Sequence, residues 1–316
     1  MIAGKALTIA SALVLATASL AAACSSTGAP RAGTPAATGT PAGTAALGQV
    51  VAVVAAESQY GDVAATVGGA YAHVTSIMTD PNTDPHSFEI STGVARAVAG
   101  ARVVVQNGLG YDPFMDRIES AAPDRRRKVI VAADLPGLPT DTANPHLWYD
   151  PAAMAEVADA VAGALSAVEP AHAAYFEARA AGFRAGLQPV LSALARFRRQ
   201  YPAVPVATTE PVADYLLQAA GARNLTPFSF QADVMNGIDP APQDISVEQD
   251  LLRKRKVKAL LYNRQVTDSL TQSFVRIARS AGVPVVGVYE LMPVGDSYAG
   301  WMLSTVEQLQ KAVSAP

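Results

Sequence analysis

Short runs rich in β-branched residues alternate along the chain with segments whose apolar residues recur at helical spacing. Helix-like segments lie between these runs, for example at 93–101 and 268–282. Strand–helix alternation is typical of helices layered on mostly parallel sheets. We therefore expect an α/β fold with two (β/α)4-like lobes. The eight runs that predict strands, four in each half, are 49–56, 73–78, 102–107, 128–133, 204–208, 223–228, 257–262 and 283–289.

The segment between the two groups of strands predicts a long connection. Asp150 and Pro151 suit the N-cap and the first position of a helix. Over residues 169–201, apolar residues recur at spacings of three and four, which predicts a longer helix that Pro189 kinks or breaks. Such a helix would be about 45 Å long, enough to bridge two lobes. We place the first lobe at 49–168, the linking helix at 169–201 and the second lobe at 202–316.

The N-terminal residues have a different composition. A single positive charge at Lys5 is followed by an apolar run and by small residues up to Cys24, which is typical of a signal peptide over 1–23. The residues before Cys24 resemble a bacterial lipobox, although Ala21 stands where the pattern prefers Leu. We therefore expect an extracytoplasmic protein that is anchored to the bacterial cell membrane by lipid on Cys24. Residues 24–48, rich in Ala, Gly, Thr and Pro, predict a disordered tether.

Composition and motifs argue against several other functions. Cys24 is the only cysteine, so neither a disulfide framework nor a cysteine-based zinc site is expected. The formal net charge is −3, and the basic runs at 125–128 and 253–256 are short, so we expect solvated turns and no nucleic acid. The chain has neither the HExxH motif of zinc proteases nor the GxSxG motif of serine hydrolases.

Two of the four histidines follow a proline in a polar loop. His86 stands in DPHSFEIS and His146 in NPHLWYDP. Proline fixes the backbone before each imidazole, so such a loop loses little entropy when the ring binds a ligand. His73, which opens a predicted strand, and His172, in a predicted helix, lack this setting, and we expect no special role for them.

Polar side chains beyond the carboxyl ends of the predicted strands complete a constellation. His86 and His146 follow strands of the first half, and Glu210 and Glu290 follow strands of the second. Ligands of open α/β sheets bind at that edge, so two facing lobes would bring two imidazoles and two carboxylates together. The set suits one divalent metal ion, whose charge the two carboxylates balance. Neighbouring residues could orient the ring nitrogens and exclude water. The candidates for these supporting positions are Asp84, Asn144, Asp150 and Trp148.

The segments DPHSFEIS, ARVVVQNGLGYDPFMDRI and NPHLWYDP resemble motifs of the cluster A-I solute-binding proteins, the metal-binding lipoproteins of zinc and manganese ABC importers. The resemblance extends from about residue 49 to the C-terminus. It implies two lobes bridged by a long helix, a metal between them, and a permease with a cytoplasmic ATPase as partners. It also implies His86 and His146 as ligands. Glu210 matches the third ligand position, where many zinc members have His and manganese-type members have Glu.

The resemblance is less specific for the fourth ligand and for the metal. Glu290 is the acid nearest to the expected position, and Asp296 is the alternative. Asn144 stands where most members have Asp, and the chain lacks the histidine-rich loop of many zinc members. Two imidazoles with two carboxylates favour Mn²⁺ or Fe²⁺, while Zn²⁺ accepts the same donors. We expect a monomer that is not an enzyme. The alternatives are a secreted zinc-dependent hydrolase and a surface adhesin stabilised by metal.

Overall fold

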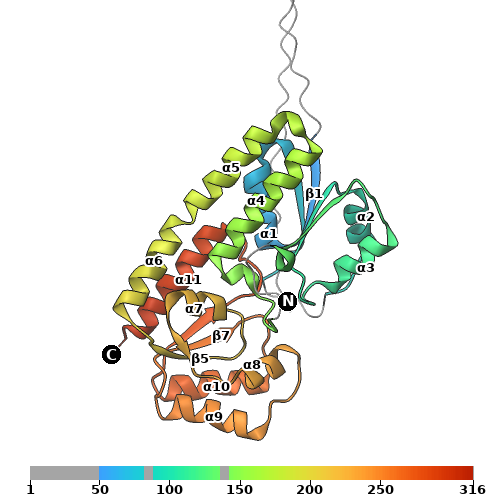
Figure 1. Ribbon diagram of the computed structural model, residues 1–316. Coiled ribbons are helices and arrows are strands. Elements are labelled where there is room, and N and C mark those ends of the chain that lie inside the picture. The colour runs from blue at the N-terminus through green and yellow to red at the C-terminus, as the bar shows by residue number, and fades with distance from the viewer. Residues whose placement is uncertain (1–49, 82–87, 136–141, 316) are drawn as a thin grey trace, which may run out of the picture. The chain divides into compact units, whose positions relative to one another are not determined.

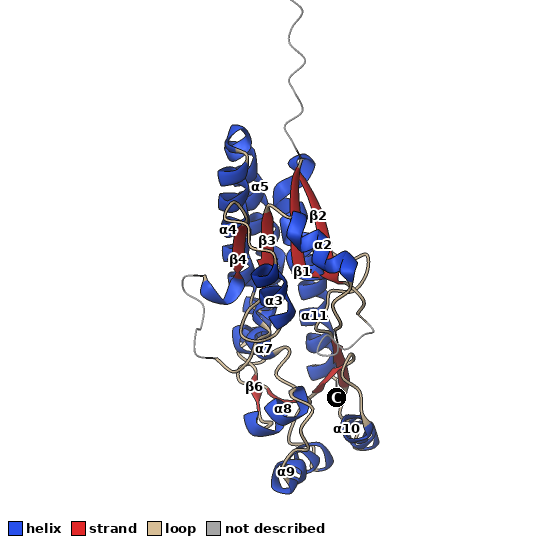
Figure 2. Ribbon diagram, turned by 90° about the vertical axis from the view of Figure 1, so that its right-hand side faces the viewer, coloured by secondary structure: helices blue, strands red, loops and turns tan. Residues whose placement is uncertain are grey.

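Two parallel sheets organise the chain, of which the computed structural model describes residues 50–81, 88–135 and 142–315. The sheets have the orders β2-β1-β3-β4 and β6-β5-β7-β8, so the second repeats the topology of the first (Figures 1 and 2). This confirms the predicted α/β fold with two similar lobes. The strands of the first lobe are β1 (Val51–Glu57), β2 (Ala72–Met78), β3 (Val103–Gln106) and β4 (Lys128–Val131). Those of the second lobe are β5 (Pro205–Thr208), β6 (Arg223–Asn224), β7 (Leu260–Asn263) and β8 (Val285–Val288).

The central strands are apolar because both of their faces are covered. Val53 of β1 lies opposite Val74 of β2 on one side and Val103 of β3 on the other. β5 and β7 occupy the corresponding central places in the second sheet and are buried along most of their length. Continuous apolar runs are typical of parallel strands with helices on both faces.

Helices and short 3-10 turns cover the two sheets. In several helices a side chain caps the first turn: Asp150 accepts a hydrogen bond from the amide of Ala152, and Asp268 from that of Thr271. The helices of the first lobe are α1 (Ser58–Gly68), α2 (Thr92–Gly100), α3 (Pro113–Ala121) and α4 (Pro151–Val168). Those of the second lobe are α7 (Asp214–Ala220), α8 (Phe228–Met235), α9 (Pro242–Arg253), α10 (Ser269–Ser280) and α11 (Tyr298–Val313). The 3-10 turns are η1 (Gly69–Tyr71), η3 (Ala132–Asp134), η4 (Leu147–Tyr149) and η5 (Pro170–His172).

Two consecutive helices connect the lobes. α5 (Ala173–Gly186) packs against α1 and α4, and α6 (Gln188–Gln200) packs against α7 and α11 (Figure 1). We predicted one long helix over 169–201 that is kinked or broken at Pro189. It is broken at Leu187, two residues earlier, because Pro189 has no amide hydrogen to donate to the carbonyl of Ala185.

One hydrophobic core extends through both lobes and the connection between them. Phe176 of α5 and Phe197 of α6 are fully buried in it, one in each half of the connection. α4 also packs in this core, and it is the one described helix whose length and apolar composition would suit a membrane span. A second cluster, around Phe230 and Phe274, fills another part of the second lobe. Contacts between the lobes are thus part of the main core, and the polar residues described next lie where the lobes meet.

Candidate metal-binding site

His146 is fully buried just before the η4 turn, and its ring is held in one orientation. Nδ1 lies 2.7 Å from Oδ1 of Asn144, which also accepts the backbone amide of His146 at 3.1 Å. The other end of the Asn144 amide donates to the carbonyl of Pro211 at 2.8 Å, which identifies Oδ1 as the atom facing the ring. Nδ1 therefore carries the proton, and Nε2 has the lone pair that a metal ligand needs.

Nε2 of His146 faces a carboxylate from the second lobe. It makes no hydrogen bond to any described residue and lies 3.6 Å from Oε2 of Glu290. Glu290, two residues beyond β8, is fully buried, and its Oε2 accepts a hydrogen bond from the hydroxyl of Tyr111 at 2.9 Å. An imidazole nitrogen and a carboxylate oxygen thus share one buried space between the lobes.

Glu210 is joined to this pair through Asn263. Glu210 lies two residues beyond β5 and is 2% exposed. The side-chain amide of Asn263, at the end of β7, donates to Oε1 of Glu210 at 3.1 Å and to Oε1 of Glu290 at 2.7 Å. Two carboxyl groups that share one neutral amide donor in a buried space form a pair of oxygen ligands beside which a cation would be favoured.

The backbone around Glu290 is held by glutamines from both lobes. Gln265 accepts hydrogen bonds from the amides of Glu290 (2.6 Å) and Leu291 (2.8 Å). Gln59, in α1, donates to the carbonyl of Glu290 at 3.2 Å. The position of this carboxylate therefore depends on the packing of α1 as well as on its own strand.

Aromatic rings close one side of the site. The Trp148 ring is fully buried and meets His146 edge-on, with ring centroids 5.2 Å apart. Tyr111 packs against the same two rings, at 5.8 Å from His146 and 4.8 Å from Trp148. The backbone of this loop is fixed by Tyr298, whose hydroxyl donates to the carbonyl of Trp148 at 2.7 Å. These rings cover part of the imidazole and help to exclude water from it.

Hydrogen bonds join the His146 loop to the second lobe at both ends. Tyr215, in α7, donates to the carbonyl of Asn144 at 2.9 Å. Tyr149 donates to the carbonyl of Tyr289 at 2.8 Å. The histidine of the first lobe and the acids of the second are consequently held in register across the boundary between the lobes.

Two further carboxyls, in the first lobe, lie close to the site. Burial, and then the charge of Asp112, raise the pKa of Glu57 well above its ordinary value. Burial also raises the pKa of Asp112 to about 6, against hydrogen bonds that its carboxylate accepts from the amides of Asn107 (2.6 Å) and Gly108 (2.9 Å). The shift favours a neutral Glu57, because its charged form would lie without water beside the charge of Asp112.

The remaining predicted residues have other positions. His86, Asp84 and Cys24 lie outside the described residues. The Asp150 carboxylate caps α4, and Asp296 is exposed in the loop before α11. Among the described residues, no group of three or more His, Cys, Asp or Glu side chains could hold a metal ion. The described part of the site is therefore His146 and Glu290 in proximity, with Glu210 linked to them through an amide.

Our sequence analysis missed Asn263, Gln265 and Tyr111. A signal for Asn263 was present, because it directly follows the predicted strand 257–262 and so lies at the same sheet edge as the acids. Tyr111 lies within the NGLGYDP segment, but its sequence position gives no indication that its hydroxyl reaches Glu290.

Comparisons with known proteins identify a matching family model, two relatives in sequence and a structure with the same fold. A family model described as zinc-uptake complex component A, periplasmic (ZnuA) matches residues 53–312. The iron-binding protein YfeA of Yersinia pestis is 22% identical over 234 residues, which cover 72% of this chain and 73% of that protein. A putative metal-binding protein of Thermotoga maritima is 31% identical over 75 residues, only 24% of this chain and 26% of that protein. The structure of the solute-binding protein FpvC of Pseudomonas aeruginosa in complex with Mn²⁺ has a TM-score of 0.69 and 21% identity, over 84% of this chain and 98% of that chain.

Proposed function

Because this chain belongs to the ZnuA family of periplasmic metal-binding transport components, we propose that it captures one divalent transition-metal ion outside the cytoplasm and delivers it to an ABC importer. Proteins of this family bind solutes for transport and are not enzymes, which argues against the secreted hydrolase. A carrier must bind its ion tightly and release it again. Ligands contributed by two lobes suit that task, because separating the lobes would dismantle the site.

The proposed ligands are His86 and His146 from the first lobe and Glu210 and Glu290 from the second. The observation that supports this set most directly is the 3.6 Å approach of Nε2 of His146 to Oε2 of Glu290 in a fully buried space. A fixed tautomer and a neighbouring carboxylate are what a dication requires of a nitrogen–oxygen donor set. Glu290 is preferred to Asp296 as the fourth ligand because Asp296 is exposed.

We propose Mn²⁺ or Zn²⁺ as the cargo, with the donor set inclining towards Mn²⁺ and with Fe²⁺ as a further candidate. Two carboxylates among four ligands make a harder set than three imidazoles would. The names of the similar proteins span all three metals: the family is described by zinc uptake, YfeA by iron binding, and the FpvC structure by Mn²⁺. The metal must therefore be identified by measurement on this protein.

We further propose that the protein acts as a monomer, anchored to the membrane by lipid on Cys24 through the tether 24–48. The partners would be a permease and its cytoplasmic ATPase. Mass spectrometry of the N-terminal peptide tests the anchor, and Cys24→Ser should move the protein from the membrane fraction to the soluble fraction. A Cys24→Ser protein that stays in the membrane fraction would contradict lipid anchoring at this residue.

Calorimetric titration of the metal-free protein tests the ligand set. The parent should bind one equivalent of Mn²⁺ or Zn²⁺, and elemental analysis of protein purified without added metal should show which ion it retains. His86→Ala and His146→Ala should each lose tight binding while the fold, followed by circular dichroism, is kept. Normal uptake by either variant would overturn the assignment.

Two comparisons sharpen this titration. His172→Ala is the matched control, because His172 lies in the 3-10 turn η5 and its ring stacks on Tyr71, with centroids 3.7 Å apart. This variant should bind metal like the parent. Glu290→Ala and Asp296→Ala decide between the two candidates for the fourth ligand, since only the former should weaken binding. The opposite result would transfer the role to Asp296.

A further inference from the structure

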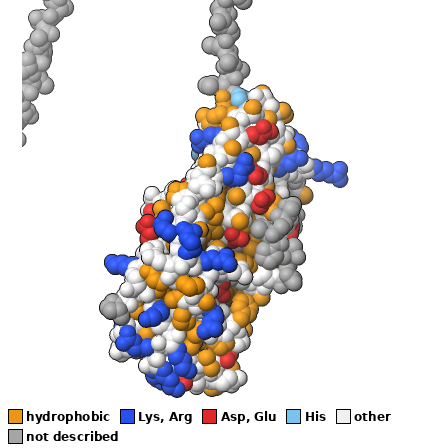
Figure 3. All heavy atoms as spheres, turned by 60° about the vertical axis from the view of Figure 1, so that its left-hand side comes forward, with side chains coloured by type: hydrophobic (Ala, Val, Ile, Leu, Met, Phe, Trp, Pro, Cys, Tyr) orange, Lys and Arg blue, Asp and Glu red, His pale blue; other side chains and the backbone are white. Residues whose placement is uncertain are grey.

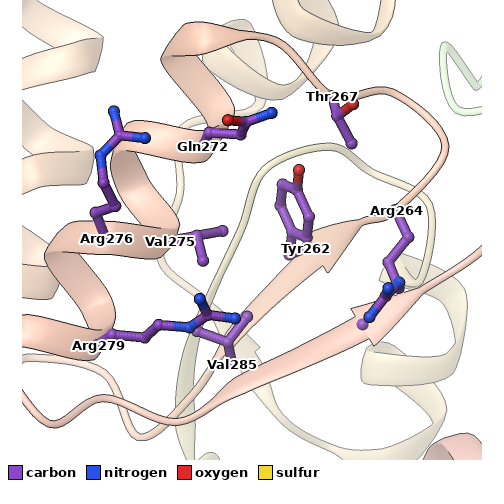
Figure 4. A pocket seen from close by; sticks show the side chains of 9 residues that line it. Tyr262, Arg264, Thr267, Gln272, Val275, Arg276, Arg279 and Val285 are labelled. Atoms are coloured by element: carbon purple, nitrogen blue, oxygen red, sulfur yellow. The ribbon is translucent and has the colours of Figure 1, made fainter. Parts of the chain in front are cut away.

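A polar cavity in the second lobe is lined by residues of α10, β7 and β8 and by the loop that follows β7. Its volume is about 410 Å³. Arg276 and Arg279 border it from α10, and Arg264 borders it from the residue after β7 (Figure 4). Tyr262, Gln272 and Thr267 add hydroxyl and amide groups to the lining. None of these residues belongs to the proposed ligand set, so the cavity is a feature separate from the metal site.

The arginines of α10 project from one stripe of the helix. Gln272, Arg276 and Arg279 are spaced by four and three residues and share a face, whereas Phe274 and Ala278 are buried on the opposite side. In Figure 4 the side chain of Arg279 reaches across towards Val285 of β8, and Arg264 lies on the strand side. Positive groups thus border the same hollow from the helix and from the sheet.

The three guanidinium groups have no acidic partner within the ranges that the structure describes. Other basic side chains of the chain do pair with acids, as Lys254 does with Asp250 at 2.6 Å and Arg126 with Asp124 at 3.2 Å. The nearby carboxylate of Asp268 caps α10, where it accepts the amide of Thr271 at 2.6 Å. On the face that carries α5 and α6, Lys and Arg side chains also gather at the lower end, over the second lobe (Figure 3).

Arg264 is held in place without an ion pair. Its aliphatic part lies against Gly287 so closely that a Cβ on this glycine would come within 2.6 Å of Cδ of Arg264. Its guanidinium carbon lies 5.7 Å from the ring centroid of Tyr289, a distance that suits a cation–π contact. A cation that packing positions beside a cavity can bind an anion with little loss of side-chain entropy.

We propose that this cavity is a binding site for a small oxyanion that carries two or more negative charges, of the phosphate class. Three guanidinium groups supply forked donors that match the oxygens of a phosphate group. The Tyr262, Thr267 and Gln272 side chains provide neutral donors for the remaining oxygens. A bound dianion also relieves the mutual repulsion of three like charges around one hollow.

Titration of the metal-free protein with inorganic phosphate tests the proposal, against chloride at matched ionic strength. The parent should bind one phosphate with a dissociation constant of about 1 mM or lower, as measured by calorimetry. The Arg276→Gln/Arg279→Gln double variant should bind at least about tenfold more weakly, because charge-assisted hydrogen bonds are lost. Arg196→Gln, which removes an exposed charge from α6, is the matched control and should bind like the parent.

Gly287→Ala provides an independent test, because it leaves every charge in place and displaces only Arg264. It should weaken phosphate binding at least about threefold, since one positioned donor group is lost. Titration with Mn²⁺ in chloride should show unchanged metal binding for the double variant, which excludes misfolding as the cause. Phosphate binding of equal strength by the parent and the double variant would overturn the proposal.

The phosphate group could belong to a free ion or to a lipid headgroup. Flotation with vesicles that contain phosphatidic acid distinguishes these sources, with phosphatidylcholine vesicles as the control. Binding of inorganic phosphate that is lost in the double variant assigns the site to a soluble oxyanion. Arginine-dependent vesicle binding without phosphate binding assigns it to the headgroup, and failure in both arms rejects the site.

Discussion

Asn263 holds two buried carboxylates together, and its replacement by aspartate tests how much the metal-free site depends on it. Asn263→Asp keeps the size of the side chain but replaces a donated amide by a third carboxylate. The hydrogen bonds to Glu210 (3.1 Å) and Glu290 (2.7 Å) would then be lost. The change adds negative charge where the structure already concentrates it.

The size of the effect follows from these distances. Each hydrogen bond to a charged acceptor is worth about 1.5–3 kcal/mol. Two carboxylates about 3 Å apart repel by roughly 5 kcal/mol at an effective dielectric constant of about 20. At pH 7 one carboxyl can instead take up a proton. This limits the cost to about 4 kcal/mol, because the carboxyl pKa must rise by about three units at about 1.36 kcal/mol per unit. We therefore expect the free energy of unfolding of the metal-free variant to fall by about 3–4 kcal/mol.

Urea unfolding followed by circular dichroism measures this change, with and without saturating Mn²⁺. A dication compensates the added charge, so Mn²⁺ should stabilise Asn263→Asp more than it stabilises the parent. Asn236→Asp, an exposed substitution at the end of α8, is the control and should change stability by less than about 1 kcal/mol. Equal urea midpoints for metal-free Asn263→Asp and metal-free Asn236→Asp would refute the role given to Asn263.

Four further substitutions test other parts of the structure. Asn144→Leu removes the acceptor for Nδ1 of His146 and should weaken metal binding by about 10–100-fold in calorimetric titration; unchanged affinity would contradict the orienting role. Glu210→His should move the preference towards zinc in competitive titration with Mn²⁺, and an unchanged ratio would count against Glu210 as a ligand. Gly108→Ala places a side chain at a φ of +81° and within 2.7 Å of a valine methyl of β4, so it should lower the free energy of unfolding by about 1–3 kcal/mol in urea; a neutral result would mean that the turn can rearrange. Glu57→Gln should flatten the pH dependence of stability. Because its pKa is raised, Glu57 keeps a proton in the folded parent that it loses in the unfolded chain. The parent therefore loses stability as the pH rises above the ordinary value of 4.5 towards the folded-state pKa, whereas the Glu57→Gln variant has no group to titrate there. Parallel curves of urea midpoint against pH for Glu57→Gln and parent would reject this account.

The sheets were predictable because a run of apolar β-branched residues reports burial on both faces of a strand. β1 and β8 show this, since each begins two residues after the predicted start. β6 shows the limit: the prediction covered 223–228, and the strand contains only Arg223 and Asn224. The side chain of Asn224 bonds to Thr208 and Asp214, and Pro227 directly precedes α8. Side-chain hydrogen bonds of this kind end a strand without changing its apolar pattern.

The site was predictable as a set of strand-end residues, but not in its connections. The strand-end rule selected His146, Glu210 and Glu290 because all three lie beyond the carboxyl ends of predicted strands. The hydrogen bonds of Asn263 join residues 53 and 27 positions away, so they depend on how three strands converge. Asn144 illustrates a second limit. Its amide serves the imidazole and the Pro211 carbonyl at once, and only the second lobe supplies that carbonyl.

The repeated strand order has a consequence for how the two lobes share their tasks. Matching strands end in matching residues: Glu57 ends β1 where Glu210 follows β5, and Asn107 follows β3 where Asn263 ends β7. One dication balances about two carboxylates. If both lobes contributed their matching acids as carboxylates, negative charge would be left over in a buried space. Glu57 is kept out of such use, since burial and the charge of Asp112 raise its pKa and favour its neutral form. Under the proposed ligand set, the first lobe thus presents nitrogen beside a neutral Glu57, and the second lobe supplies the carboxylates that meet the ion.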